Sequence, residues 1–522
     1  MIPIPLSAHS PLRRHLLRAA ALLPMASLGS RRAHGQPSSN RLLRIIGPWE
    51  LSSLDPLRNG YLFARMQVTE TLVDYDSQGQ PQPGLAAAWQ VSADRLQWRF
   101  SLQPNARFHD GSAVRPADVV AALERARHAA GVLAHAPVAE IVAEPATIRI
   151  RLTRPFAPLL ALLSHSSTQV LGPASFGPGG IVRAIVGTGP YRIVELEPPQ
   201  RFAVSAFPAW RGQQPAVTRA QYLSVGRAEM RALMAEGGQA ELAYGLDPGS
   251  IARLARLPGV RIHAVTVPRT TSLKLNLAHP FLAEPATRRA LSLALDRRGI
   301  ASAILRAPEL AAGQLFPPSL PGWHDPALTP LVHDGTESRR LLASTGWRAG
   351  DDGILRRGNA RFALTLRTFP DRPELPVIAT AIQEQLRLVG IQVRVAVGNS
   401  SDIPFAHRDG TLEIGLLARN YGVVPDAYGT VAQDFGANGG DWGAMGWSAA
   451  GVTQALAALA AAPEARESQA MRSQISGILQ QDLPLIPVVW YRQTLAASPR
   501  LDNVSIDPYE RTYRLTQMRW KS

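Results

Sequence analysis

The sequence of 522 residues contains no cysteine. This absence excludes disulfide bonds, a thiol nucleophile, a zinc site built on cysteine and a lipid anchor attached to cysteine. Lysine is almost absent too, since Lys274 and Lys521 are the only two, and neither stands in a glycine-rich phosphate-binding loop. The G-x-S-x-G and H-E-x-x-H motifs of common hydrolases are also missing.

What is present is typical of a globular protein. Hydrophobic residues make up 46% and charged residues 18% of the chain, a balance that allows a large core. The length predicts two or three compact units. The formal net charge is +15, but the arginines are scattered rather than clustered with aromatic residues, so we expect no nucleic-acid partner.

The first 35 residues have the composition of an export signal. Arg13 and Arg14 form a twin-arginine pair that precedes a short apolar run at 19–28, too short to span a bilayer. Ala33 to Gly35 offers a small-x-small cleavage site. We therefore expect a signal peptide at 1–35, and a mature protein that is soluble, periplasmic and not lipid-anchored. The alternative is a basic extension without a targeting role.

Residues 272–301 contain the most regular pattern in the chain. Leu273, Leu275 and Leu277 alternate with polar residues, which predicts a half-buried strand. Pro285 then opens a helix whose apolar residues recur at helical spacing, and Gly299 is expected to end it. Similar strands and helices alternate along the chain, including a helix expected at 61–72, so the predicted class is α/β or mixed α+β.

Motifs in this segment and elsewhere resemble one known family. Asn276, Pro280-Phe281, Arg289-Ala290 and Asp296-Arg297 match its "N…PF…VR.A…AIDR" pattern, and residues 187–191 match its "GTGPY" turn. The sequence is similar to the extracytoplasmic solute-binding proteins of ABC importers for peptides and nickel, family 5. The matches keep their order from about residue 42 to 492.

The resemblance implies a bilobal periplasmic-binding-protein fold with an extra N-terminal subdomain and a ligand cleft between the lobes. The implied division places lobe I at 36–84, 185–268 and 485–522, the extra subdomain at 85–184 and lobe II at 269–484. The chain would cross between the lobes near 266–274 and 482–492, and closure would be a hinge motion.

The resemblance extends to the nickel and metal-chelate branch through Arg408-Asp-Gly410, Tyr421-Gly422 and Pro425-Asp426. Two positions differ from the nickel binders. Residues 436–440 contain no histidine where that branch supplies one, and Ser167 or a neighbour replaces its cleft arginine. The sequence therefore predicts no metal-ligating residue and no cofactor, and leaves a metal chelate, an opine or a short peptide as the ligand.

The expected ligand-binding residues are arginines, which suit a carboxylate-bearing ligand, together with aromatic residues and one acid: Arg58, Tyr61, Arg269, Arg419, Tyr421, Asp426, Trp442 and Trp447. The two tryptophans fit a role in core packing equally well. The resemblance implies a monomer that delivers its small-molecule ligand to the permease subunits of an ABC transporter in the inner membrane. No catalytic residue is predicted.

Two other classes of function are compatible with this length and signal. One is a secreted hydrolase that uses paired carboxylates, which no sequence motif would mark. The other is an oligopeptide-binding, chaperone-like protein that uses the same cleft.

Overall fold

The computed structural model describes residues 41–129, 132–370, 372–437, 439–461 and 465–521. The expected signal peptide at 1–35 lies outside these residues. Residues 39–522 form one compact unit. None of the described helices is both long and apolar enough to cross a membrane.

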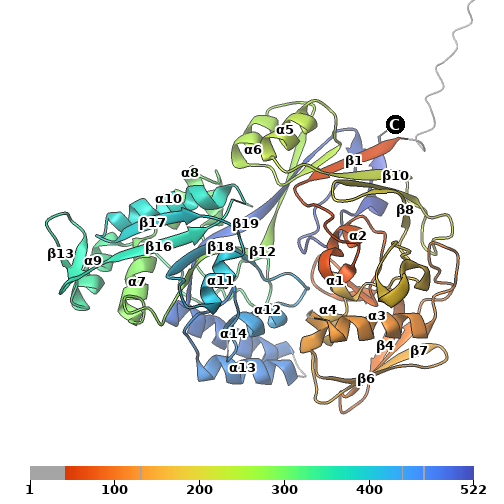
Figure 1. Cartoon of the computed structure of the whole chain (residues 1–522), viewed down its shortest axis with the longest axis horizontal. Helices are drawn as coiled ribbons and strands as arrows, with labels where there is room; N and C mark the ends of the chain where they lie inside the picture. Colours follow the sequence, from red (N-terminus) through yellow and green to blue (C-terminus); the bar gives the residue numbers. More distant parts are fainter. Residues whose placement is uncertain (1–40, 130–131, 371, 438, 462–464, 522) are drawn as a thin grey trace, which may run out of the picture. The chain divides into compact units, whose positions relative to one another are not determined.

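A ten-stranded sheet runs through this unit in the order β17-β16-β18-β12-β19-β11-β1-β10-β9-β8 (Figure 1). Its strands are β1 (Leu42–Gly47), β8 (Tyr191–Glu197), β9 (Arg201–Ala206), β10 (Arg219–Ser224), β11 (Leu242–Tyr244), β12 (Arg261–Leu275), β16 (Ala363–Thr368), β17 (Gln392–Val397), β18 (Ile414–Asn420) and β19 (Leu485–Ala497). The sheet contains both parallel and antiparallel strand pairs, and helices connect many of its strands. This arrangement confirms the predicted mixed α/β class.

A separate four-stranded antiparallel sheet has the order β4-β5-β7-β6 and is covered by a helix, α3 (Figure 1). Its strands are β4 (Ala86–Val91), β5 (Gln97–Leu102), β6 (Val138–Ala143) and β7 (Thr147–Leu152). Trp98, Phe100, Ile148 and Ile150 alternate along β5 and β7 and are buried against α3 (Pro116–His128). This face forms a core of its own.

The remaining elements are shorter strands and the helices. The strands are β2 (Val73–Tyr75), β3 (Pro81–Pro83), β13 (Arg348–Ala349), β14 (Leu355–Arg357), β15 (Ala360–Arg361), β20 (Leu501–Asp502) and β21 (Arg519–Trp520). The other helices are α1 (Pro56–Asn59), α2 (Tyr61–Arg65), α4 (Leu159–Leu162), α5 (Ala228–Glu236), α6 (Pro248–Leu254), α7 (Pro285–Ala294), α8 (Arg297–Ala303), α9 (Gly335–Ser344), α10 (Glu374–Arg387), α11 (Asp402–Arg408), α12 (Tyr428–Phe435), α13 (Ala450–Ala461) and α14 (Ala465–Asp482).

Strands β12 and β19 connect the two halves of the large sheet. The first part of β12 pairs with the end of β19 beside β11, and its second part, from Arg269, pairs with β18. Between Thr266 and Thr270 the β12–β19 register shifts. Pro268 lies in this irregular stretch, where its lack of an N–H interrupts the ladder. The crossings between lobes predicted near 266–274 and 482–492 overlap these two strands, and the division into lobes stays a prediction.

The segment at 272–301 differs from its prediction in two ways. Its strand is buried on both faces. The polar side chains are accommodated there by hydrogen bonds: Lys274 donates to His407 Nδ1 over 2.7 Å and to the Gly443 carbonyl, and Asn276 donates to the Leu412 carbonyl over 2.8 Å. Gly299 does not end the helix. Instead α7 stops at Ala294, and Gly299 lies in α8, where its N–H is capped by Asp296.

The helix expected at 61–72 is also shorter than predicted. It ends at Arg65, because Gln67 adopts a left-handed conformation with φ of 55°. The Gln67 side chain exchanges two hydrogen bonds with Thr516, at 3.1 and 3.0 Å. The residue at which the helix is interrupted, Gln67, is therefore bonded to the C-terminal segment that contains Thr516.

Candidate functional site

A cavity with a volume of about 1160 Å³ is formed by segments far apart in the sequence. One wall consists of α1, α2 and residues 164–167, and a second of Trp210 and its neighbours. The C-terminal residues 507–517 form a third wall. Arg269 from β12, Asn420 from β18 and Val423 complete the lining from the other half of the large sheet.

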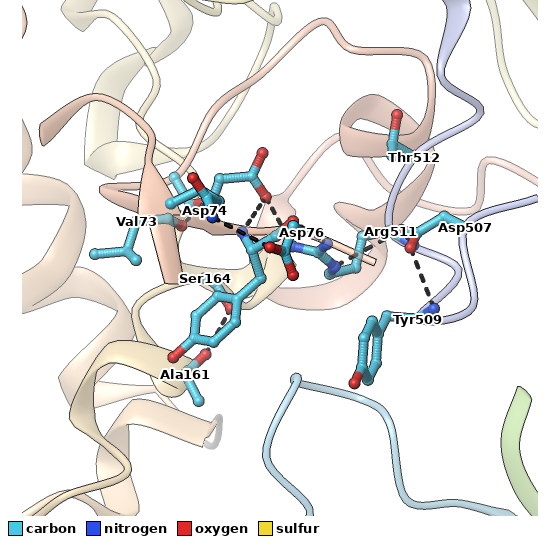
Figure 2. Close-up of polar contacts among 12 residues, drawn as sticks. Val73, Asp74, Asp76, Ala161, Ser164, Asp507, Tyr509, Arg511 and Thr512 are labelled. Atoms are coloured by element: carbon cyan, nitrogen blue, oxygen red, sulfur yellow. Dashed lines mark hydrogen bonds and ion pairs between the residues drawn. The ribbon is translucent and has the colours of Figure 1, made fainter. Parts of the chain in front are cut away.

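Arg511 fastens the C-terminal wall to β2 (Figure 2). Its Nη1 donates to Asp74 Oδ1 over 2.7 Å, and its Nη2 donates to the Tyr75 carbonyl over 2.6 Å. The backbone N–H of Arg511 donates to the buried Asp507 carboxylate over 2.9 Å. Charge-assisted bonds of this kind join the C-terminal wall to β2.

A second polar cluster surrounds Glu510, where the cavity meets the strand crossing. Arg269 Nη2 donates to Glu510 Oε2 over 2.5 Å, and Arg65 Nε donates to the Glu510 carbonyl over 2.8 Å. The guanidinium groups of Arg269 and Arg372 lie 4.9 and 4.8 Å from the ring centre of Tyr491. Burial raises the pKa of Glu510, but the neighbouring Arg269, Arg65 and Arg372 outweigh it and lower that pKa below its usual value.

Arg211 and Glu70 form a bidentate pair in the wall beside Trp210, with N–O distances of 2.8 and 2.5 Å. Both side chains are 16% exposed, so the pair is largely withdrawn from water. Each group satisfies the other, and this part of the wall has little charge left for a ligand.

His165 lies in the wall beside α1 and α2. Its Nδ1 accepts a hydrogen bond from the Ser167 backbone N–H over 3.1 Å and lies 2.8 Å from the Ser167 hydroxyl. The ring caps the short 3-10 helix at Ser166–Thr168. Burial lowers the pKa of His165 to about 4, so the imidazole is neutral at pH 7.

Three of the expected ligand-binding residues line the cavity. Arg58 follows the α1 cap made by Asp55, and its exposed guanidinium has no hydrogen-bond or ion-pair partner in the described part of the chain. Tyr61 starts α2, with its ring 5.0 Å from the Arg65 guanidinium. Arg269 lines the cavity but directs one N–H to Glu510.

Arg419, Tyr421 and Asp426 are not among the lining residues. Arg419 is bound to the buried Asp434 carboxylate through Nε at 2.6 Å and Nη2 at 2.7 Å. Tyr421 is fully buried against Phe316. Asp426 accepts a hydrogen bond from the Tyr428 N–H over 2.8 Å at the start of α12.

The two expected tryptophans pack in the half of the sheet that contains β16 to β18. Trp442 lies beside Phe369, and Trp447 Nε1 donates to Asp482 Oδ2 over 2.9 Å. Neither lines the cavity in this structure. A contact of these two or of Arg419, Tyr421 and Asp426 with a ligand stays a prediction.

Several lining residues were not expected from the sequence, namely Glu70, His165, Arg211, Asp507, Glu510 and Arg511. Arg211 stands in a stretch that matches the family pattern, so that match could have suggested it. His165 and the C-terminal residues belong to no motif. The partners of the C-terminal residues lie too far away in the sequence for any local pattern to indicate them, as in the Arg511–Asp74 pair.

Within the described residues, no group of three or more histidine, aspartate or glutamate side chains is arranged to hold a metal ion. The lining contains both acidic and basic side chains, and among its donors are the Arg58 guanidinium and His165. Such groups donate hydrogen bonds to oxygen atoms of a ligand.

Comparison with known proteins identifies relatives of this chain. The model of the bacterial extracellular solute-binding proteins, family 5 (middle region), matches residues 80–442. The nickel-binding periplasmic protein of Escherichia coli K12 is 27% identical over 374 residues, which cover 67% of this chain and 69% of that protein. The glutathione-binding protein GsiB of Salmonella typhi is 25% identical over 319 residues, covering 60% of each chain.

The fold also matches solved structures. The crystal structure of NikA from Brucella suis, in complex with Fe(III)-EDTA, superposes with a TM-score of 0.84 at 23% sequence identity, covering 92% of this chain and all of that one. The likeness shows that the two chains share the bilobal fold of periplasmic binding proteins, as the sequence predicted.

Proposed function

Because the chain belongs to the bacterial extracellular solute-binding proteins of family 5, we propose that it captures a small carboxylate-bearing ligand in the cavity between its lobes. The ligand classes are a metal chelate, an opine or a short peptide. The protein then passes its ligand to the permease of an ABC importer in the inner membrane. We propose that it works as a monomer in the periplasm and that its action includes no chemical step.

One observation carries this proposal: residues from both halves of the large sheet line the same cavity. Arg58 and Tyr61 come from α1 and α2, which follow β1 in the N-terminal half, while Asn420 ends β18 in the other half and Val423 lies just beyond it. A ligand that touches both sets gains its full contacts only when the two halves close around it, so binding favours the closed state.

The polar lining supports the ligand class. Arg58 offers a guanidinium that has no hydrogen bond or ion pair among the described residues, and arginine binds planar carboxylates through two parallel N–H bonds. The relatives are named for nickel and glutathione, and the solved neighbour holds Fe(III)-EDTA. EDTA and glutathione both carry carboxylates. Since the described residues provide no metal-binding cluster, a metal would enter this cavity as a chelate.

The proposed lobes follow the boundaries expected from the sequence, with lobe II at 269–484. The hinge is then the pair β12 and β19, where the register shifts between Thr266 and Thr270. The Glu510 cluster lies beside this shift, so the hinge and the cavity share Arg269.

The experiment is a calorimetric screen of the full chain with Fe(III)-EDTA, glutathione and octopine. We expect at least one probe to bind and to compact the protein in small-angle scattering. Binding without a decrease in radius of gyration would contradict closure, and turnover of a probe would contradict a purely binding role.

The substitution Arg58→Ala tests the carboxylate contact. We expect a loss of affinity of about 10-fold for the probe that binds, the size of one hydrogen bond to a charged group. Arg340→Ala is the matched control, because Arg340 is exposed on α9 and pairs only with Glu337. Equal affinities in the two variants would exclude Arg58 from the ligand contact.

A further inference from the structure

His165 is a half-buried imidazole in the cavity wall whose two nitrogens differ in their surroundings. Nδ1 faces the Ser167 N–H and hydroxyl, whereas Nε2 has no partner within the part of the chain that the structure describes. The ring is held in place, because Ser167 and Thr168 are buried and the Thr168 hydroxyl bonds the Leu163 and His165 carbonyls.

We infer that His165 is a specificity-determining residue that donates its Nε2–H to a carboxylate oxygen of the ligand and does not coordinate a metal. This inference rests on the proposed function, since it concerns the ligand of the same cavity.

The tautomer follows from the partner of Nδ1. A backbone N–H can only donate, so the Ser167 N–H requires a lone pair on Nδ1. A neutral imidazole with a lone pair on Nδ1 carries its proton on Nε2. Nε2 of this lining residue, which has no partner among the described residues, is therefore a hydrogen-bond donor.

The same geometry opposes metal binding through Nε2. Coordination needs a lone pair on Nε2, which would move the proton to Nδ1. That proton would then point at the Ser167 N–H, and the capping bond of the 3-10 helix would be lost. A metal in this cavity must therefore bring its own ligands, and His165 contacts an oxygen of the chelator.

The neighbouring wall indicates the charge of that oxygen. Gln169, at the end of the same 3-10 helix, donates from Nε2 to the Gly60 carbonyl over 2.7 Å and so ties His165 to the junction of α1 and α2. These helices carry Arg58 and Tyr61 into the cavity. A donor imidazole on the same wall as an unpaired guanidinium favours an anionic acceptor, which a carboxylate provides.

The first test is the tautomer itself. Full-length protein labelled with ¹⁵N-histidine is compared with the variant His165→Asn, which assigns the His165 signals. We expect the Nε2–H tautomer at pH 7, and a shift of the Nε2 signal when the binding probe is added. A proton on Nδ1, or a charged ring at pH 7, would overturn the inference.

The second test is affinity for the probe that binds among Fe(III)-EDTA, glutathione and octopine. His165→Asn keeps an acceptor for the Ser167 N–H, but its shorter side chain brings no N–H to the Nε2 position, so we expect affinity to fall about 10-fold with little change in melting temperature. His165→Gln keeps an N–H near the Nε2 position and should retain affinity within about threefold. His333→Asn, on an exposed histidine, is the control.

The outcomes separate the two hypotheses. Unchanged affinity in His165→Asn would overturn the inference alone, as would binding of NiCl₂ without chelator that His165→Asn abolishes. Failure of every probe to bind would overturn the proposed function, and the ligand contact of His165 with it.

Discussion

Two regions of the molecule were expected to contact the ligand, and their arginines have different environments. On α1, Arg58 is exposed to the cavity and has no partner among the described side chains, whereas Arg419 on β18 is held by two short bonds to the buried Asp434. The sequence cannot separate these two cases. An arginine can bind a ligand when the fold leaves its guanidinium unpaired, and the fold decides this through residues elsewhere in the chain.

The largest expected effect comes from breaking the Arg419–Asp434 pair. Arg419→Ala leaves a carboxylate buried without its counter-charge, so we expect the free energy of unfolding to fall by about 3 kcal/mol. Ligand affinity of the folded variant should stay within about twofold. Urea denaturation and calorimetry measure the two quantities.

The double variant Arg419→Ala/Asp434→Ala is the control, because it removes the unpaired charge and should recover part of the stability. A large loss of affinity in Arg419→Ala with unchanged stability would reverse the comparison and place Arg419 at the ligand.

A smaller effect is expected at the strand crossing. Glu510→Gln leaves Arg65 and Arg269 without their shared carboxylate, so stability at pH 7 should fall by about 2 kcal/mol. Because Glu510 also lines the cavity, affinity should change together with stability. A joint change in stability and affinity would therefore distinguish the Glu510 cluster from Arg58, whose loss should lower affinity, and from Arg419, whose loss should lower stability.

The pH dependence of Glu510→Gln has a defined sign. The folded-state pKa of Glu510 lies below its usual value, so its stabilising contribution is present above about pH 4.5 and is lost as pH falls through the folded pKa. As the pH falls below about 4.5, the free energy of unfolding should therefore decrease less in Glu510→Gln than in the natural protein. Glu467→Gln, on an exposed glutamate of α14, should follow the natural protein. Identical acid profiles for Glu510→Gln and the natural protein would contradict this.

The smallest effect concerns Trp447. Trp447→Phe removes the hydrogen bond from Nε1 to Asp482 while keeping an aromatic ring beside Phe435, so we expect a loss of about 1 kcal/mol and unchanged ligand affinity. Thermal unfolding and calorimetry test both. A stronger effect on affinity than on stability would show that this tryptophan reaches the ligand.

The family and the fold could be predicted from the order of short motifs, and both are confirmed. Local patterns also indicated the strand that contains Leu273 and the starts of the helices after Gly60 and Glu284, because periodicity and proline positions are local properties, but they did not indicate where these helices end. The alternation around Lys274 indicated a half-exposed strand, but the lysine is buried because acceptors more than 130 residues away receive its hydrogen bonds.

The cavity wall was harder to predict for the same reason. Arg58 and Tyr61 could be named as candidates from the sequence, whereas His165 belongs to no motif, although its partner, the Ser167 N–H, lies only two residues ahead. Arg511 joins the wall through Asp74, 437 positions earlier in the sequence. Contacts of this kind depend on the completed fold, and no spacing within one segment encodes them.

The C-terminal wall has a consequence for biosynthesis. Residues 507–517 line the cavity, and Arg65 and Gln67 are bound by Glu510 and Thr516. A ribosome makes the N-terminal segments first, so a nascent chain lacks this wall until residue 517 has emerged. The cavity wall is therefore completed only after almost all of the 522 residues have been translated.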